Sequence, residues 1–423
     1  MTDFSSFNLN PSIMKALKSK GYSKPTPIQS QAIPHVLEQK DVLAIAQTGT
    51  GKTAAFSLPI IHLITENKIR LKNKNVRCLI LTPTRELASQ IEQNIKTYSE
   101  NLNLSSTVIF GGVGKTPQVN RTKKGVEILI ATPGRLLDLM SEGHIKYEQL
   151  ELFVLDEADR MLDMGFIHDI KKIIAKLPKK KQTLLFSATM PKDIVGLASK
   201  LLHKPVRVEV TPESTTVEKI EQKVIFMDKL NKVHLLKAIV NETKLESALV
   251  FTKTKHGADK VVKKLEQANI LAAAIHGNKS QNARERALNN FKTGKINILV
   301  ATDIAARGID VPGVQYVFNF DLPHEPESYV HRIGRTARAG KEGIAISFCD
   351  VPEIKLLKNI EKSIRYKIPV EENIPEFEKQ TAVAQPQLSR NKKPAQRSTR
   401  KETQKAPKGD DKKSSSRNRK RRR

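Results

Sequence analysis

The sequence predicts an α/β protein with two tandem parallel-sheet domains and a disordered basic C-terminal tail. Short apolar runs alternate with helix-like stretches, and such near-continuous apolar runs are typical of strands in a parallel sheet covered on both faces. The pattern restarts after about residue 215, which indicates a second domain of similar size. Residues 380–423 hold 16 Lys or Arg against three acids and no aromatic residue, too little apolar surface to offset the entropy of ordering.

Six predicted strands belong to each domain. The first set is Val42–Ala46, Val76–Thr82, Thr107–Phe110, Glu127–Ala131, Leu152–Asp156 and Thr183–Phe186. The second set is Val224–Met227, Ala248–Thr252, Leu271–Ile275, Ile296–Thr302, Val314–Phe320 and Ile344–Phe348. Right-handed βαβ connections between such strands give a layered α/β fold.

A cluster of Pro, Ser and Thr between Pro205 and Thr216 is typical of a linker. It divides the chain into a first domain, a linker, a second domain and a tail. Their predicted ranges are 1–205, 206–218, 219–370 and 371–423.

Composition limits the partners and the compartment. The chain carries 73 Lys or Arg against 44 Asp or Glu over 423 residues, and its net charge of +29 indicates a polyanionic partner. The two cysteines, Cys78 and Cys349, exclude a disulfide framework and a Cys-based zinc module, and they fit a reducing, cytoplasmic compartment. The N-terminus lacks the regions of a signal peptide, and no apolar run approaches the roughly 18 residues of a membrane span, so we expect neither.

A glycine-rich loop follows the first predicted strand and precedes a helix-like stretch. It reads Ala46-Gln47-Thr48-Gly49-Thr50-Gly51-Lys52-Thr53. Glycines let backbone N–H groups turn toward a phosphate, and the positive N-terminus of the following helix favours the same ligand. Lys52 can reach the β- and γ-phosphates, and the Thr53 hydroxyl can hold Mg²⁺. The strict phosphate-loop pattern begins with glycine instead of alanine, and a chance Gly/Thr-rich turn is the alternative interpretation.

An acidic segment follows another predicted strand of the first domain. Leu152–Leu155 is followed by Asp156-Glu157-Ala158-Asp159, so the acids come at the carboxyl end of the strand, where ligands bind in parallel sheets. Asp156 would bind Mg²⁺ through water, and Glu157 would orient and deprotonate the attacking water. An acidic helix N-terminus favoured by the helix dipole is the alternative.

Three arginines of the second domain lie in one short segment, His331–Arg338, which also contains Gly334. Guanidinium groups at this spacing could contact a phosphoryl group, and an arginine finger contributes roughly 10³–10⁵ in rate. A solvated basic helix face is the alternative, although the glycine argues mildly against an ordinary helix.

Together these segments resemble the DEAD-box RNA helicases of superfamily 2, over roughly residues 4–365. Gly21–Gln29 resembles the Q motif, with Phe4 at the upstream aromatic position, and Ala46 in the phosphate loop is the family's usual form. Ala337 stands where glycine is more common. The other matching segments are Pro83–Leu87, Gly111–Gly112, Thr132–Arg135, Ser187–Thr189, Gln281–Arg284, Ala301–Asp303 and Ala306–Asp310. Three segments have sequences similar to those of the bacterial RhlE-like subgroup: Asp163–Asp169, Thr254–Gly257 and His276–Gln281.

For the nucleotide, the resemblance implies two RecA-like domains that bind ATP and Mg²⁺. Gln29 would read the adenine, Phe4 would stack on it, and Asp303 would meet the ribose. The phosphates, the metal and the water would be held by Lys52, Thr53, Asp156, Glu157, Arg335 and Arg338. An amide can hydrogen-bond adenine at two points. Other interpretations stay open: Gln29 as an exposed helix-start residue, Phe4 as a core anchor, and Asp303 as a helix N-cap.

For RNA, the resemblance implies contacts from loops of both domains. The first domain would supply Thr84, Arg85, Gly111, Gly112, Thr132 and Arg135, and the second Gln281, Arg284 and Thr302. Hydrolysis would be coupled to unwinding by Asp159, Ser187, Thr189 and His331. Hydroxyl and backbone donors contact phosphates and sugars without reading sequence. Aromatic residues are only 5% of the chain, so we expect backbone recognition rather than base stacking.

The expected function is that of an ATP-dependent RNA helicase, which couples ATP hydrolysis to local, non-processive duplex unwinding or RNP remodelling. Ribosome assembly and RNA turnover are two settings that such an activity would fit. A DNA helicase or translocase is an alternative within the same class. A non-enzymatic RNA clamp that binds ATP, and an RNA annealer that acts through the basic tail, are alternatives from other classes.

Overall fold

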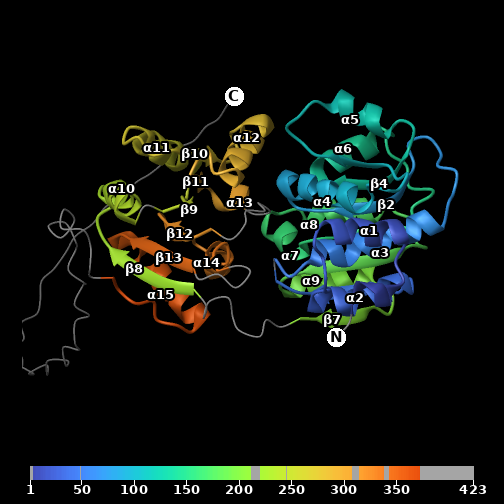
Figure 1. Ribbon diagram of the computed structural model, residues 1–423, viewed down its shortest axis with the longest axis horizontal. Helices are drawn as coiled ribbons and strands as arrows, with labels where there is room; N and C mark the ends of the chain where they lie inside the picture. The colour runs from blue at the N-terminus through green and yellow to red at the C-terminus, as the bar shows by residue number, and fades with distance from the viewer. Residues whose placement is uncertain are drawn as a thin grey trace, which may run out of the picture. The chain divides into compact units, whose positions relative to one another are not determined.

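Two parallel β-sheets organise the chain (Figure 1). The computed structural model describes residues 3–47, 49–210, 220–243, 245–306, 314–337 and 343–371. All strand pairs within both sheets are parallel. The predicted α/β fold class with two parallel-sheet domains is therefore confirmed, and each of the twelve predicted strands is present.

The first sheet has seven strands in the order β3-β4-β2-β5-β6-β1-β7. Its strands are β1 (Val42–Ile45), β2 (Val76–Leu81), β3 (Ser106–Ile109), β4 (Val126–Ala131), β5 (Leu152–Leu155), β6 (Gln182–Ser187) and β7 (Val206–Glu209). The helical elements around them are η1 (Phe4–Phe7), α1 (Pro11–Ser19), α2 (Pro27–Leu37), α3 (Lys52–Glu66), α4 (Arg85–Tyr98), α5 (Lys115–Thr122), α6 (Pro133–Ser141), α7 (Ala158–Asp163), α8 (Ile167–Ile174) and α9 (Lys192–Leu201).

The second sheet has six strands in the order β10-β11-β9-β12-β13-β8. Its strands are β8 (Ile220–Phe226), β9 (Ala248–Phe251), β10 (Ala272–Ile275), β11 (Ile298–Ala301), β12 (Tyr316–Asn319) and β13 (Gly343–Cys349). The helical elements are α10 (Lys232–Thr243), α11 (Lys255–Glu266), α12 (Gln281–Lys292), α13 (Asp303–Ala306), α14 (Pro326–Ile333), η2 (Val351–Glu353) and α15 (Ile354–Ile364).

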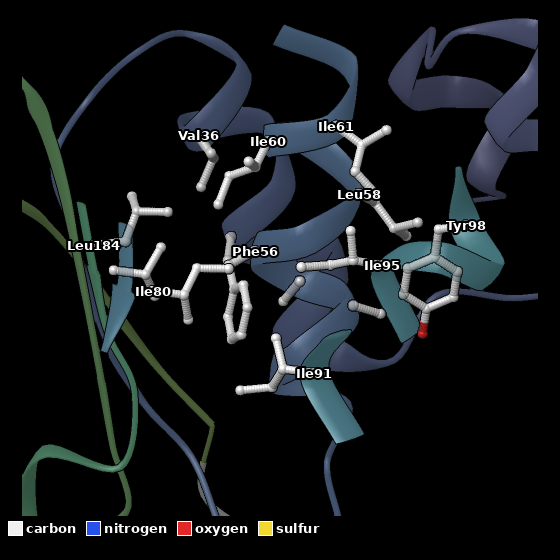
Figure 2. Packing of buried hydrophobic residues seen from close by; sticks show 14 of the residues in the cluster. Val36, Phe56, Leu58, Ile60, Ile61, Ile80, Ile91, Ile95, Tyr98 and Leu184 are labelled. Atoms are coloured by element: carbon white, nitrogen blue, oxygen red, sulfur yellow. The ribbon is translucent and has the colours of Figure 1, made fainter. Parts of the chain in front are cut away.

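Apolar helices cover the first sheet and fix the helix that follows the phosphate loop. Strands β2, β5 and β6 are buried along their whole length, as expected for a parallel sheet covered on both faces. Figure 2 shows Phe56, on α3, among the side chains between the sheet and helix α4. Phe56 meets Phe186 of β6 edge-to-face, with ring centroids 5.2 Å apart. This packing holds α3 and therefore the position of Lys52 at its first turn.

Strand order divides the carboxyl edge of the first sheet into two halves. Parallel strands end at the same edge, so the loops after neighbouring strands lie side by side. Strands β5, β6 and β1 are consecutive in the sheet, and so are β3, β4 and β2. The loops after the first group carry the predicted ATP and coupling residues, and the loops after the second carry the predicted RNA residues.

The predicted start of the linker at residue 206 is wrong. Val206–Glu209 form strand β7, which pairs with β1 in the register Val42↔Val206. Only Val208 of this edge strand is buried, so the strand is short and half-exposed, and its apolar signal is weak. Residues 211–219, which include most of the predicted linker, and the tail from residue 372 lie outside the described residues. Among the helices that are described, none is long and apolar enough to cross a bilayer.

Candidate ATPase site and RNA interface

The glycine-rich loop has the geometry of a phosphate-binding turn. It joins the end of β1 to α3, and Gly49 and Gly51 take φ values of +86° and +94°. A Cβ at Gly51 would lie 2.4 Å from Gln29 Nε2, so a larger residue there would displace the Gln29 amide. Lys52 is buried, and its Nζ donates to the Ala46 carbonyl at 2.7 Å. Thr50 Oγ1 donates to the Gln47 carbonyl at 2.8 Å. Thr48 lies outside the described residues.

Gln29 links the N-terminal segment to this loop. Its Oε1 accepts from the Thr26 backbone N–H at 3.0 Å, and its Nε2 donates to the Gly51 carbonyl at 3.2 Å. Gln29 is buried, so the interpretation as an exposed helix-start residue is wrong. Each end of its amide makes one of the two hydrogen bonds it can form, so one donor and one acceptor position remain for adenine, whose recognition stays a prediction.

The stacking role expected for Phe4 disagrees with the structure. Phe4 is 2% exposed and belongs to the hydrophobic core, so it offers no free ring face to a ligand. Phe4 is instead a core anchor, the alternative left open by the sequence. Tyr22, which the sequence interpretation missed, stacks on Phe4 with centroids 6.4 Å apart and is 42% exposed. The sequence could have pointed to Tyr22 as an aromatic residue near the nucleotide loop, because it comes directly after Gly21 in the Q-motif segment.

The two acids after β5 form a buried carboxylate pair. Glu157 takes φ 54° and ψ 51°, a left-handed conformation that is uncommon outside glycine and turns the chain into α7. Asp156 Oδ1 is buried without a hydrogen-bond partner among the described residues. Burial, followed by the neighbouring charge of Glu157, raises the pKa of Asp156 to about 7. Opposing charge comes from Lys52 and from Arg160, whose Nη1 lies 2.8 Å from Glu157 Oε2.

This donor set fits a hydrated divalent cation. Among the described residues there is no cluster of three or more Asp, Glu, His or Cys side chains that could hold a metal. Mg²⁺ typically binds through one or two protein oxygens and completes its shell with water and phosphate oxygens. The unpaired Asp156 oxygen, with Thr53 at the start of α3, is consistent with such a site.

The structure brings three of the predicted coupling residues together. Asp159 Oδ2 accepts from Thr189 N at 2.8 Å and from Thr189 Oγ1 at 2.9 Å. The Asp159 backbone N–H donates to Ser187 Oγ at 3.2 Å, and Ser187 Oγ donates to the Thr189 carbonyl at 2.7 Å. A shift of the acidic segment therefore moves the end of β6 directly.

The RNA candidates of the first domain converge at the ends of β2, β3 and β4. Thr84 caps α4 and accepts from Leu87 N at 3.3 Å, and Thr132 is the N-cap residue of α6. The Arg85 guanidinium lies against Gly112, where a Cβ would come within 2.0 Å of it, and Gly111 lies beside the same group. Arg135 Nη2 donates to the Val113 carbonyl at 3.2 Å. Two further Arg135 nitrogens, Nε and Nη1, are buried without a hydrogen-bond partner in the described parts of the chain, although Nε lies 3.8 Å from Asp138 Oδ2, so donors remain for a ligand.

In the second domain, the candidates lie at helix starts after strands. Gln281 and Arg284 occupy the first turn of α12, whose N-cap Ser280 accepts from Ala283 N at 3.3 Å. Thr302 follows β11 directly. Their RNA contacts stay a prediction.

Asp303 is bound by Arg332, a buried arginine that the sequence analysis counted among three arginines able to contact a phosphoryl group. Arg332 donates to both Asp303 oxygens, at 2.6 and 2.8 Å, and to the Asp321 carbonyl at 2.7 Å. Its guanidinium also lies 5.0 Å from the centre of the Phe251 ring. The ribose role of Asp303 stays a prediction, and the carboxylate keeps acceptor positions for a hydroxyl beside the two that Arg332 occupies.

Arg335 and His331 line one small cavity with Asp303, of about 10 Å³, which is room for about one water. Arg335 is buried. Ala337 takes φ 52°, a conformation that favours glycine, in agreement with the family's more common residue there. Arg338 lies outside the described residues.

Comparison with known proteins agrees with this arrangement. The family model described as DEAD/DEAH box helicase matches residues 26–196, and the helicase conserved C-terminal domain matches residues 231–340. The chain is 43% identical over 368 residues to the ATP-dependent RNA helicase CshA of Listeria monocytogenes, covering 87% of this chain and 70% of that protein. It is 42% identical over 365 residues to the DEAD-box ATP-dependent RNA helicase CshA of Bacillus subtilis, covering 86% and 73%.

Solved structures agree as well. Saccharomyces cerevisiae Dbp5 bound to RNA and ADP BeF3 aligns with a TM-score of 0.76 and 30% identity, over 88% of this chain and 95% of that one. A DEAD box protein from the hyperthermophile Methanococcus jannaschii aligns with a TM-score of 0.52 and 40% identity, over 88% and 99%. The RhlE-like subgroup stays a prediction. The phosphate loop, the acidic segment and the two matched regions show that this chain belongs to the DEAD/DEAH box helicase family.

Proposed function

We propose that this protein is an ATP-dependent RNA helicase that couples ATP hydrolysis to local, non-processive RNA unwinding or RNP remodelling. One observation carries the proposal: with the strand order β3-β4-β2-β5-β6-β1, the loops that hold the first domain's RNA candidates and its phosphate and metal candidates lie on adjoining halves of one sheet edge. Both CshA relatives are named as ATP-dependent RNA helicases, and the Dbp5 structure contains RNA with ADP BeF3.

The first domain would hold the nucleotide phosphates and prepare the water. Backbone N–H groups around Gly49 and Gly51 would surround the phosphates, and Lys52 would exchange its contact with the Ala46 carbonyl for a phosphate oxygen. Thr53 and Asp156 would hold Mg²⁺, which when bound neutralises charge on the β- and γ-phosphates. Glu157 would orient the attacking water and accept its proton.

The second domain would complete the site through Arg335 and Arg338. Two domains joined by a linker can close on ATP, so that these arginines meet the γ-phosphate only in the closed state. The coupling is reciprocal in free energy: if RNA favours the closed state that hydrolyses ATP, ATP must favour the state that holds RNA. The contacts among Asp159, Ser187 and Thr189 join the loops after β5 and β6, so a change at the acidic segment would be passed to the end of β6.

RNA would be held by its backbone. The threonine caps, the Gly111–Gly112 turn and the arginines beside it present hydroxyl, N–H and guanidinium donors, which position a strand without reading its bases. In the closed state, the RNA candidates of the second domain would join these donors on the same RNA strand. The combined contacts would bend that strand and destabilise a short duplex.

An ATPase and unwinding assay with full-length protein tests the proposal. Turnover should rise with added RNA, should rise less with single-stranded DNA, and should disappear in Lys52→Ala, as should unwinding of a short RNA duplex. Equal stimulation by DNA would favour a DNA helicase or translocase. Binding of ATP and RNA without turnover would favour a clamp. Strand exchange that survives Lys52→Ala would favour an annealer acting through the tail.

A further inference from the structure

A buried arginine contacts the carboxylate that the proposed mechanism uses as its base. Arg160 lies three residues after Glu157, and its Nη1 donates to Glu157 Oε2 at 2.8 Å. The two side chains are only 2% and 8% exposed. Arginine is almost never fully buried unless it is paired, so this position has a specific partner.

Stability alone does not explain the pair. Burial removes the hydration of both ions, and replacement of a buried pair by apolar residues of similar volume is often neutral or stabilising. Ala158 and Met161, on the same helix α7, belong to an apolar core cluster. The charged pair is therefore weak evidence of a stabilising role and favours a role in the chemistry.

Backbone geometry makes position 160 able to hold the carboxylate. Glu157 takes its left-handed conformation between the end of β5 and the start of α7. Residues three apart on a helical turn are neighbours, which brings Arg160 onto the Glu157 side chain. The Arg160 backbone N–H also donates to Asp159 Oδ1 at 3.1 Å. Arg160 is thus joined to the acidic segment through both its backbone and its side chain.

Two polar atoms at this segment lack partners. Arg160 Nη2 and Asp156 Oδ1 are buried, and neither has a hydrogen-bond partner among the described residues. Buried polar atoms are nearly always satisfied, and exceptions often mark where water, an ion or a ligand belongs. Arg160 therefore borders a ligand site and is not part of a completed core.

We propose that Arg160 is a positioning residue for ATP hydrolysis: it fixes Glu157 through Oε2 and leaves Oε1 to orient the attacking water. This inference rests on the proposed function. An ionised carboxylate accepts hydrogen bonds on both oxygens, so one can be held while the other binds water. A misplacement of about 1 Å in such a site can lower the rate about 10²-fold.

The chain provides a matched control for this inference. Arg77, on β2, is also buried, and its Nε donates to Glu151 Oε1 at 2.6 Å. Arg77 lies near the amino end of its strand, and in the described part of the chain its side chain donates to Glu151 and to the Ile64 carbonyl, neither of which is a proposed ATP or RNA residue. The Glu151 side chain is 35% exposed, so Arg77→Met reports what the loss of a buried arginine paired with a glutamate does to the protein by itself.

The test compares full-length wild type, Arg160→Met, Arg160→Lys and Arg77→Met. For each we would measure RNA-stimulated kcat, KM for ATP, affinity for a fluorescent ADP analogue and thermal unfolding. Arg160→Met should lower kcat about 10²-fold and change ADP affinity by less than about threefold. Arg160→Lys keeps one charged donor and should lower kcat only about tenfold. Arg77→Met should keep wild-type kcat at temperatures where it is folded.

Several results would overturn the inference. One is an Arg160→Met enzyme that keeps more than half of wild-type kcat. A second is an equal loss of kcat in Arg160→Met and Arg77→Met. A third is an Arg160→Met enzyme that loses nucleotide affinity and keeps its kcat. If Arg160→Met does not fold, Arg160→Lys decides, and wild-type kcat in that variant would count against the positioning role. If the wild-type protein shows no RNA-stimulated turnover, the proposed function is wrong and this inference falls with it. If the wild-type protein is active, the results above test the role of Arg160 alone.

Discussion

Gly51→Ala separates backbone strain from a specific collision in the phosphate loop. Gly51 takes φ +94°, and Gly49 takes φ +86°. An alanine at either position adopts a backbone conformation that costs an L residue about 1–2 kcal/mol. The surroundings of the added Cβ differ between the two positions. At Gly51 it lies 2.4 Å from Gln29 Nε2, whereas at Gly49 no atom of the described residues lies within 4 Å.

The collision adds a second cost at Gly51 only. Gln29 must withdraw its amide and lose the hydrogen bond to the Gly51 carbonyl, which contributes about 1 kcal/mol. If the free loop relaxes and only the nucleotide-bound loop needs this geometry, the cost appears in nucleotide affinity. Strain alone predicts a Kd about 5–30-fold higher for Gly49→Ala. The extra term predicts a further increase of about fivefold for Gly51→Ala.

Titration with a fluorescent ATP analogue, with thermal unfolding as a check on folding, measures both variants. The decisive comparison uses Gln29→Ala, which removes the atom nearest to the new Cβ and leaves Thr26 Oγ1 at 3.1 Å. In that background, most of the extra cost of Gly51→Ala over Gly49→Ala should disappear. Equal Kd values for the two single variants, or an undiminished difference between them in the Gln29→Ala background, would refute the collision with Gln29 as the cause.

The remaining predictions concern the acids, the arginine segment and the tail. Glu157→Gln keeps the shape of the side chain and removes the base, so ATP should still bind while turnover disappears; RNA release measured with and without ATP should then slow with ATP, and equal rates would contradict the role. Arg338→Ala should lower RNA-stimulated turnover by about 10³ or more at nearly unchanged ATP affinity, with Arg335→Ala as the comparison. An Arg338→Ala protein that keeps half of the wild-type turnover would contradict the role of Arg338 as an arginine finger. Because the pKa of buried Asp156 is raised to about 7, the folded nucleotide-free protein binds more protons than the unfolded chain between about pH 4 and 7, and stability falls as pH rises through that window. In thermal unfolding from pH 5 to 8, the Tm of Asp156→Asn should therefore rise relative to the Tm of wild type as pH rises. Parallel plots of Tm against pH for the two proteins would contradict the raised pKa of Asp156. Deletion of residues 380–423, with a net charge of +13, should weaken RNA binding mainly at low salt and leave turnover at saturating RNA within about twofold; ATPase rates against RNA concentration at two salt levels check this, and an unchanged half-saturating concentration at low salt would show that the tail is no tether.

Most of the fold was predictable because buried parallel strands leave a strong local pattern. Twelve strands were found from continuous apolar runs, with bounds within a few residues of those in the structure. The thirteenth, Val206–Glu209, was assigned to the linker because an edge strand buries little and alternates apolar with charged residues. Its pairing with β1 depends on tertiary packing that no short window contains.

The site residues were predicted less evenly. The glycines of the phosphate loop and the acids after β5 show their chemistry in the sequence, since the strand, the turn and the helix are consecutive. The role of Phe4 was not visible, because an aromatic residue near the N-terminus can stack on a ligand or enter the core, and only its 2% exposure decides. The pairing of Arg160 with Glu157 and of Arg332 with Asp303 was not predicted, because the sequence does not show which arginine is buried or which acid lies beside it.

The sequence by itself determined which short segments carry phosphate-binding and acid chemistry, and that each follows a strand. The tertiary structure decided which of these segments are neighbours. Gln29 contacts Gly51 across 22 residues of chain, Asp159 contacts Thr189 across 30, and Arg332 contacts Asp303 across 29. The strand orders that bring such segments together come from how whole sheets and helices bury apolar surface. That is a property of long-range packing, whereas a motif is a property of consecutive residues, so the ATP and RNA halves of the first sheet's edge could be located only in the folded protein.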